Sequence, residues 1–287
     1  MQKIKVDLQR GEQLAFADRV KPEGEPSNMP MSQNELEDLK YAKELLENPG
    51  LAARITDALG TAIDKGFELL PAKWSDVVQQ TTKESLRKAL EFAVMTMDNR
   101  PRVSSWSFLH KMFAATSGAV GGSFGLPALT VELPVSTIIM LRSIADIARS
   151  EGEKIKTLEA KLACLEVFAL GGKSPGDDST ETGYFVIRAA FAREISEVAK
   201  YISKKGLAKE GAPAIARFIT KIASRFGVNV SEKIAAQAVP LIGAAGGALI
   251  NTIFIDHFQD MARGHFIIRR LERVYGTDEV KCQYEKL

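Results

Sequence analysis

The residues best suited to chemistry lie in the segment INTIFIDHFQDMARGHFIIRR, residues 250–270. With 3.6 residues per helical turn, Asp256, Asp260 and Arg263 fall on one stripe of a helix whose other side chains are largely apolar. Charges on a helix that is apolar on nearly every side are expected to pair rather than to meet water. The pattern therefore predicts a buried charge network of Asp256, Asp260 and Arg263 that fixes the register of this helix.

The same stripe also allows a metal site or a small-ligand site, with Arg263 orienting an anion. The donors would be three carboxylates and one imidazole: Glu132, Asp256, His257 and Asp260. Such a donor set favours manganese, magnesium or iron over zinc. Di-metal sites in four-helix bundles use a Glu-x-x-His pair, which this chain lacks, because Glu166 has no histidine three residues later. Glu132 also has a simpler explanation, since Thr130 as an N-cap would place it in the first turn of a helix.

Two short motifs resemble catalytic signatures but lack the required context. GGSFG, residues 121–125, matches the G-x-S-x-G pattern around Ser123. That motif needs a strand before the serine, and the preceding KMFAATSGAV indicates a helix. GGKS, residues 171–174, lacks the first glycine of a phosphate-binding loop, because Val167 occupies that position. The sequence therefore assigns no catalytic residue.

Two glycine-rich apolar segments, Ala114–Leu141 and Ile234–Ile255, leave three interpretations open. They could form a helical core, span a membrane, or insert one hairpin into a membrane surface. The second segment carries no formal charge, but its polar residues and Pro240 argue against a span. We expect a peripheral contact with lipid or with a membrane protein. The lipid-facing side chains in this hypothesis are Leu241, Ile242, Leu249 and Ile250.

Composition excludes some classes of protein. The chain of 287 residues has 38 basic and 36 acidic side chains, so no concentrated positive charge is available for nucleic acid. Its two cysteines argue against a disulfide framework, and its N-terminus has no apolar export segment. We expect a cytoplasmic protein, peripheral to the inner membrane.

Apolar periodicity predicts an all-α fold, a single bundle of about eight to ten helices with the two glycine-rich segments at its centre. Residues 1–31 would be a tail or arm, 32–276 the helical domain and 277–287 a C-terminal tail. The predicted helices are Ser32–Asn48, Leu51–Leu70, Trp74–Met97, Trp106–Gly125, Thr130–Arg149, Thr157–Leu170, Ser179–Lys204, Ala214–Phe226, Ser231–Gln237 and one after Pro240 that ends at Tyr275. Ser32 and Glu35 have the spacing of a capping box.

Three stretches resemble the EcsC family: GGSFGLPALTVELPVSTIIMLRSIADIARSEGE, CLEVFALGG and AVPLIGAAGGALINTIFIDHFQDMARGHFIIRRLERVYG. The resemblance covers residues 32–276. It implies a bacterial helical protein that acts near membranes, since the family is named for a gene beside those of an ABC transporter. It transfers no catalytic residue.

These observations favour a non-enzymatic, membrane-associated accessory protein that engages lipid or a membrane-protein partner, such as a transporter, through apolar helices. The alternative is a metal-dependent enzyme or metal-binding helical protein. Whether the protein is an enzyme, and its oligomeric state, stay open.

Overall fold

The computed structural model describes residues 30–47, 50–60, 63–97, 125–171, 183–207, 212–239 and 243–287. All regular elements within these ranges are helical, which confirms the predicted all-α fold. The elements are α2 (Gln33–Glu47), α3 (Leu51–Leu59), α4 (Asp64–Glu68), α5 (Trp74–Thr96), α7 (Gly125–Ser150), α8 (Leu158–Glu166), the 3₁₀ turn η1 (Val167–Ala169), α9 (Gly183–Lys205), α10 (Pro213–Ala238), α11 (Gly243–Tyr275) and α12 (Thr277–Lys286).

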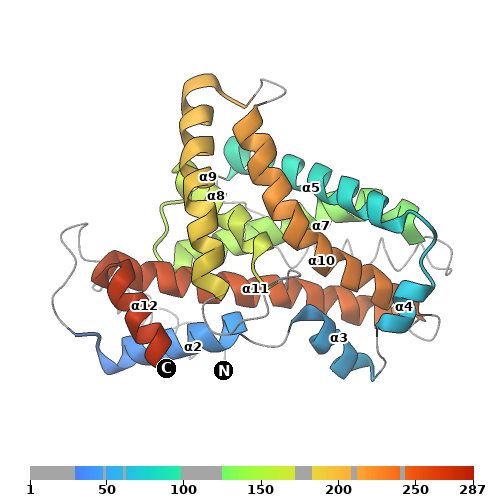
Figure 1. Ribbon diagram of the computed structural model, residues 1–287, viewed down its shortest axis with the longest axis horizontal. Coiled ribbons are helices and arrows are strands. Elements are labelled where there is room, and N and C mark those ends of the chain that lie inside the picture. Colours follow the sequence, from blue (N-terminus) through green and yellow to red (C-terminus); the bar gives the residue numbers. More distant parts are fainter. Residues whose placement is uncertain are drawn as a thin grey trace, which may run out of the picture.

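The long helix α11 is the axis of the molecule (Figure 1). Helices α2 and α3 lie along one side of it, and α7 and α10 pack on it from the other. Because α7 contacts α11, the predicted central packing of residues 106–149 with residues 231–275 is confirmed for the described part. Residues 106–124 of the first region lie outside the described ranges.

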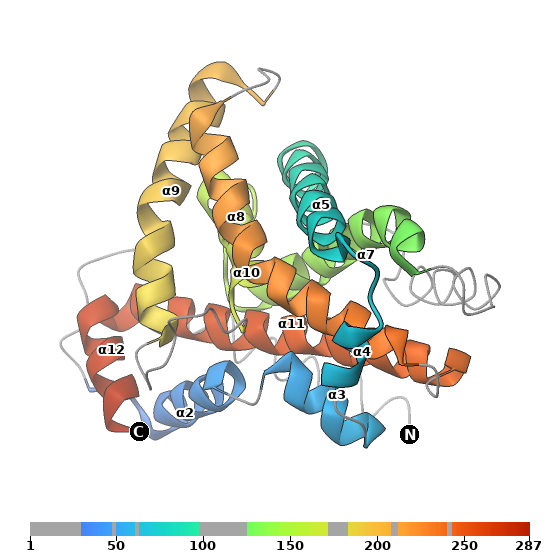
Figure 2. The same ribbon diagram turned by 45° about the vertical axis from the view of Figure 1, so that its right-hand side comes forward.

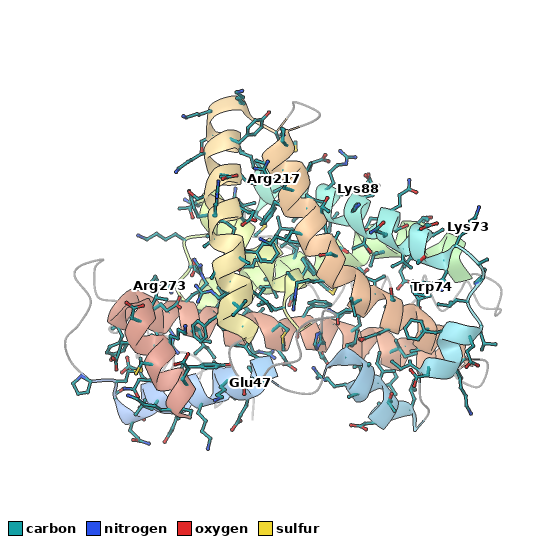
Figure 3. The ribbon with its side chains drawn as sticks, in the orientation of Figure 1. Glu47, Lys73, Trp74, Lys88, Arg217 and Arg273 are labelled. Carbon is teal, nitrogen blue, oxygen red and sulfur yellow. The ribbon has the colours of Figure 1, made fainter. Side chains whose placement is uncertain are left out.

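Helix α9 and the first half of α10 form a hairpin that rises away from α11 in both ribbon views (Figures 1 and 2). Arg217, on this part of α10 (Figure 3), pairs with Glu197 of α9 across 2.8 Å. Where α4 is followed by α5, the ring of Trp74 at the start of α5 is tilted against that of Phe67 of α4, with ring centroids 5.6 Å apart. The hairpin and the α4–α5 corner therefore each hold together through local contacts.

Local signals fix several helix starts as predicted. The backbone N–H of Ser32 donates to Glu35 Oε2 across 2.9 Å, and that of Glu35 donates to Ser32 Oγ across 3.4 Å, which confirms the capping box. Thr157 caps α8 by accepting a hydrogen bond from the backbone N–H of Ala160 across 3.2 Å. Side chains that satisfy the first free N–H groups thus set where α2 and α8 begin.

The structure differs from the sequence prediction at other boundaries. The helix predicted over residues 51–70 is interrupted after Leu59, because Gly60 has a positive φ of 64° that ends α3. The two helices predicted between residues 214 and 237 are one helix, α10, in which Asn229 is buried at the point of the predicted break. Tertiary packing has overridden the weak helix propensity of Gly227 to Asn229.

Two further boundaries also differ. Helix α7 begins at Gly125 and keeps Pro134 inside it, so Thr130 is not an N-cap and Glu132 does not owe its place to a first turn. Residues 277–287, predicted as a tail, form α12 after a positive φ of 84° at Gly276. Val280 and Tyr284 of α12 are buried, which is why this charged segment packs on the domain.

Candidate functional site

The predicted charge network is present in part. Arg263 Nη1 donates to Asp260 Oδ1 across 2.9 Å, and Arg54 of α3 donates to Asp260 Oδ2 across 3.1 Å. The side chains of Asp260 and Arg263 are 19% and 43% exposed, so this pair is not the buried one that the apolar pattern predicts. Asp256 is exposed, and partial burial together with the negative charge of Asp260 raises its pKa. Helical periodicity did not identify Arg54 as a partner of Asp260, because Arg54 lies on a different helix.

The four predicted metal ligands are not brought together. Glu132 Oε1 pairs with Lys233 Nζ across 2.6 Å, and that ammonium lies 5.0 Å from the ring centroid of Phe254 on α11. Asp256 comes two residues after Phe254 and therefore points about 200° away around the helix. The carboxylates of Glu132 and Asp256 thus lie on opposite sides of α11.

His257, the fourth predicted ligand, is buried against Gly171 at the end of the turn that follows η1. A Cβ atom added to Gly171 would lie 2.5 Å from His257 Nε2, and this nitrogen has no hydrogen-bond partner among the described residues. Burial, with the positive charge of Arg54, lowers the pKa of His257 to about 4. In the described ranges, no three His, Cys, Asp or Glu side chains are grouped so that they could hold a metal.

The four side chains predicted to face lipid differ in their exposure, and two of them lie outside the described ranges. Leu249 is 41% exposed, Ile250 is buried, and Leu241 and Ile242 lie outside the described ranges. None of the described helices is long and apolar enough to cross a bilayer.

Exposed apolar side chains on α7 accompany Leu249. Val131 is 71% exposed and Val135, one turn later, is 38% exposed. The first parts of α7 and α11 lie at the same end of the molecule in both ribbon views (Figures 1 and 2). We call residues 129–135 of α7 and 246–253 of α11 the glycine-rich end. A Cβ added to Gly247 would have nothing within 4 Å, so this glycine does not serve a close helix contact in the structure.

A buried polar cluster joins α8, α9 and α11, and the sequence did not identify it. His265 Nδ1 lies 3.0 Å from the hydroxyl of Tyr184, and His265 Nε2 lies 3.9 Å from Glu166 Oε2. All three side chains are buried. Glu166 Oε1 and His265 Nε2 have no hydrogen-bond partner in the part of the chain that the structure describes. Buried polar atoms without partners are uncommon and costly, so this cluster is a candidate site.

Burial sets the protonation of this cluster. It raises the pKa of Glu166 to about 7, although the charges of Arg188 and Arg269 oppose the rise. Burial also lowers the pKa of His265 well below its usual range, and the same two arginines add to that effect. Burial therefore favours the neutral imidazole of His265 and brings the pKa of Glu166 close to neutral pH.

Each arginine beside the cluster forms an ion pair with a carboxylate other than Glu166. Arg188 pairs with Glu272 across 2.6 Å, and Arg269 pairs with Glu153 across 2.7 Å. A sequence signal for the cluster did exist, because Glu166 is a carboxylate inside the apolar run CLEVFALGG. The partners could not be predicted, since Tyr184 and His265 reach Glu166 only through the packing of α9 and α11 on α8.

Comparison with known proteins identifies one family. The model of the EcsC protein family matches residues 33–271, which include α2 through most of α11. No curated protein and no solved structure matches the chain.

Proposed function

This chain belongs to the EcsC protein family, and we propose that it is a non-enzymatic accessory protein that binds a membrane surface through its glycine-rich end. The observation that carries the proposal is the exposure of Val131, Val135 and Leu249 on the first parts of α7 and α11, two helix segments that lie at one end of the molecule (Figure 1). This end belongs to both glycine-rich apolar segments. Exposed apolar side chains grouped at one place are typical of surfaces that meet lipid or protein.

The small size of the exposed apolar surface supports reversible binding. Burying one valine or leucine side chain fully contributes about 1.5–3 kcal/mol, and these three are already partly buried. Such a surface would lie in the headgroup region of a bilayer rather than cross it. We therefore propose that the protein associates with a membrane surface reversibly.

Flotation of the full chain with liposomes tests this proposal. We expect the parent protein to float, and Val131→Asp and Leu249→Asp each to lower the partition coefficient at least tenfold. Such a loss corresponds to about 1.4 kcal/mol, less than the cost of removing one buried apolar side chain and placing a carboxylate among lipid.

Val186→Asp is the matched control, because Val186 is 63% exposed but lies on α9, outside the glycine-rich end. This variant should float like the parent. Thermal melts of all variants check that each is folded. A parent protein that stays at the bottom of the gradient, or equal losses for Val186→Asp and Val131→Asp, would contradict the proposal. A soluble parent that instead co-purifies with a membrane protein, with the interaction lost in Val131→Asp, would identify a protein partner at this surface and reject lipid.

A further inference from the structure

We propose that Glu166 and His265 form a proton-binding site, in which uptake of one proton reverses the hydrogen bond between His265 and Tyr184 and so loosens the start of α9 on α11. The geometry that supports this site is the 3.9 Å separation of Glu166 Oε2 and His265 Nε2, two buried groups on different helices. A shift of about 1 Å in either side chain gives a normal hydrogen bond. The site is independent of the glycine-rich end.

The form without the added proton has one consistent arrangement of hydrogen bonds. Glu166 is a carboxylate and can only accept, so a hydrogen bond to it requires that His265 carry its proton on Nε2. The other ring nitrogen, Nδ1, then accepts from the Tyr184 hydroxyl, 3.0 Å away. In this form α9 is tied to α11 by a hydrogen bond that Tyr184 donates, and Nε2–H points its proton at the carboxylate of Glu166, 3.9 Å away.

Adding one proton reverses each of these bonds. The added proton reaches the Tyr184 oxygen, the hydroxyl proton passes to His265 Nδ1, and the Nε2 proton passes to Glu166. The products are a neutral carboxylic acid that donates to Nε2 and a neutral imidazole that donates from Nδ1 to Tyr184. One proton has been gained, no group other than Glu166 has changed charge, and the Tyr184 hydroxyl proton has lost its acceptor.

The charges around the site explain why Glu166 takes the proton. The ionisable groups that face it from the packed elements are Tyr184 and Arg188 of α9, Arg269 and Glu272 of α11, Glu153 of the turn after α7, which binds Arg269, and Tyr284 of α12, which stacks on Tyr184. Both arginines hold another carboxylate at ion-pair distance. Among the ion-pair distances within the described ranges, the one that involves Glu166 joins it to the neutral His265, so its ionised form is stabilised less than those of Glu153 and Glu272.

The consequence concerns the attachment of α9. Its first two turns are tied to α11 by the Tyr184–His265 hydrogen bond and by the Arg188–Glu272 ion pair. Proton uptake leaves the ion pair intact and reverses the hydrogen bond, so that the buried hydroxyl proton of Tyr184 has no acceptor among the described residues, which is unfavourable. The base of the α9–α10 hairpin should therefore be held less firmly when Glu166 is protonated.

Nitrogen-15 NMR of the imidazole rings in the full chain tests the site, because ¹⁵N shifts distinguish the two neutral tautomers. Between pH 5 and pH 9 we expect His265 to change from the Nδ1–H to the Nε2–H tautomer with a midpoint near pH 7, without becoming a cation. His257 is the matched control, since it is also buried and its Nε2 has no hydrogen-bond partner among the described residues. Its tautomer should not change over pH 6–9.

Glu166→Gln sharpens the test. A glutamine amide does not titrate, whether it donates to Nε2 or accepts from it, so the tautomer of His265 in this variant should be the same at every pH. If the tautomer of His265 in the parent protein is constant from pH 5 to pH 9, or if it still changes in Glu166→Gln, the proposal is wrong. The parent measurement decides the question even if the variant does not fold.

Stability against pH gives a second measurement. Because the folded-state pKa of Glu166, about 7, lies above its unfolded value, its contribution is fully present below pH 4.5 and is lost as the pH rises to 7. The Tm of Glu166→Gln relative to the parent should therefore increase between pH 5 and pH 8. The titration of His265 acts in both proteins and largely cancels from the difference. A Tm difference that does not change with pH would overturn the assignment of the proton to Glu166.

Discussion

The first half of α11, residues 243–258, and its second half, residues 259–275, contact the rest of the protein in different ways. In the first half, Gly247 faces open space and Leu249 is exposed. In the second half, Arg269, Arg270 and Arg273 all bind carboxylates of other elements. Figure 3 shows Arg273 at the far C-terminal end of this half. One continuous helix therefore joins an apolar, partly uncovered end to an end that ion pairs fix.

Glycine has opposite roles in the two halves. A Cβ on Gly264, in the second half, would lie 2.7 Å from Leu46 Cγ and 2.9 Å from the Ala42 carbonyl oxygen of α2. Gly264 therefore permits the close approach of α2. At Gly247, by contrast, an added Cβ would have no atom within 4 Å. A glycine-rich pattern alone therefore does not distinguish helix packing from an uncovered surface.

The largest expected effect is at the polar end, for Glu153→Gln. Glu153 binds both Arg269 and Arg273, and its side chain is nearly buried. Burial acts to raise the pKa of Glu153, but its hydrogen bonds and the charges of the two arginines outweigh this and lower the pKa. Removing the carboxylate leaves Arg269 without its charge partner and should cost about 3 kcal/mol at pH 7, measured by urea unfolding.

The stability cost of Glu153→Gln depends on pH, in a direction set by the lowered pKa of Glu153. Since the folded-state pKa of Glu153 is depressed, its stabilisation is present above the unfolded value of 4.5 and is lost as the pH falls below it. Parent and variant should therefore converge in acid. The control is Glu159→Gln, an exposed carboxylate in the first turn of α8, which should cost no more than about 1 kcal/mol. Equal losses of stability for Glu153→Gln and Glu159→Gln would contradict the conclusion that ion pairs fix the second half of α11.

An intermediate effect is expected for Gly264→Ala, with Gly247→Ala as its matched control. Overpacking at Gly264 should destabilise by about 1–3 kcal/mol, because the Ala42 backbone oxygen cannot move as a flexible side chain does. At Gly247 the same substitution should be neutral or should stabilise by up to about 1 kcal/mol, since alanine favours a helix. Thermal melts of the two variants measure both effects. A loss of stability at Gly247 as large as that at Gly264 would show that the first half of α11 is packed as closely as the second.

The smallest effect is expected where the two halves meet, for Arg263→Met. Asp260 keeps Arg54 when Arg263 is removed, and Arg263 is 43% exposed. The cost should be below about 1 kcal/mol, the range of exposed ion pairs. Urea unfolding at low and high salt measures it. A loss of about 3 kcal/mol or more would mean that the pair is buried, as the apolar pattern by itself predicts.

The sequence predicted the fold class, the central place of residues 231–275 and several helix ends because these depend on local signals. The Ser32–Glu35 capping box is complete within four residues, and the apolar periodicity of α11 is continuous to Tyr275. The split after Leu59 was missed because glycine adopts positive and negative φ about equally well, so Gly60 by itself does not show that α3 ends there. The unbroken α10 was missed because the burial of Asn229 depends on the helices that pack around it.

By itself, the sequence determined which side chains are unusual: acids and histidines within apolar helices, and glycines within uncharged segments. What each of these side chains contacts depends on how the helices pack in the tertiary structure. It separated Glu132 from Asp256 and placed Glu166 beside His265 of α11, 99 positions later in the chain. Helical periodicity specifies the direction of a side chain on its own helix, whereas its partner depends on how different helices cross, which no local pattern encodes.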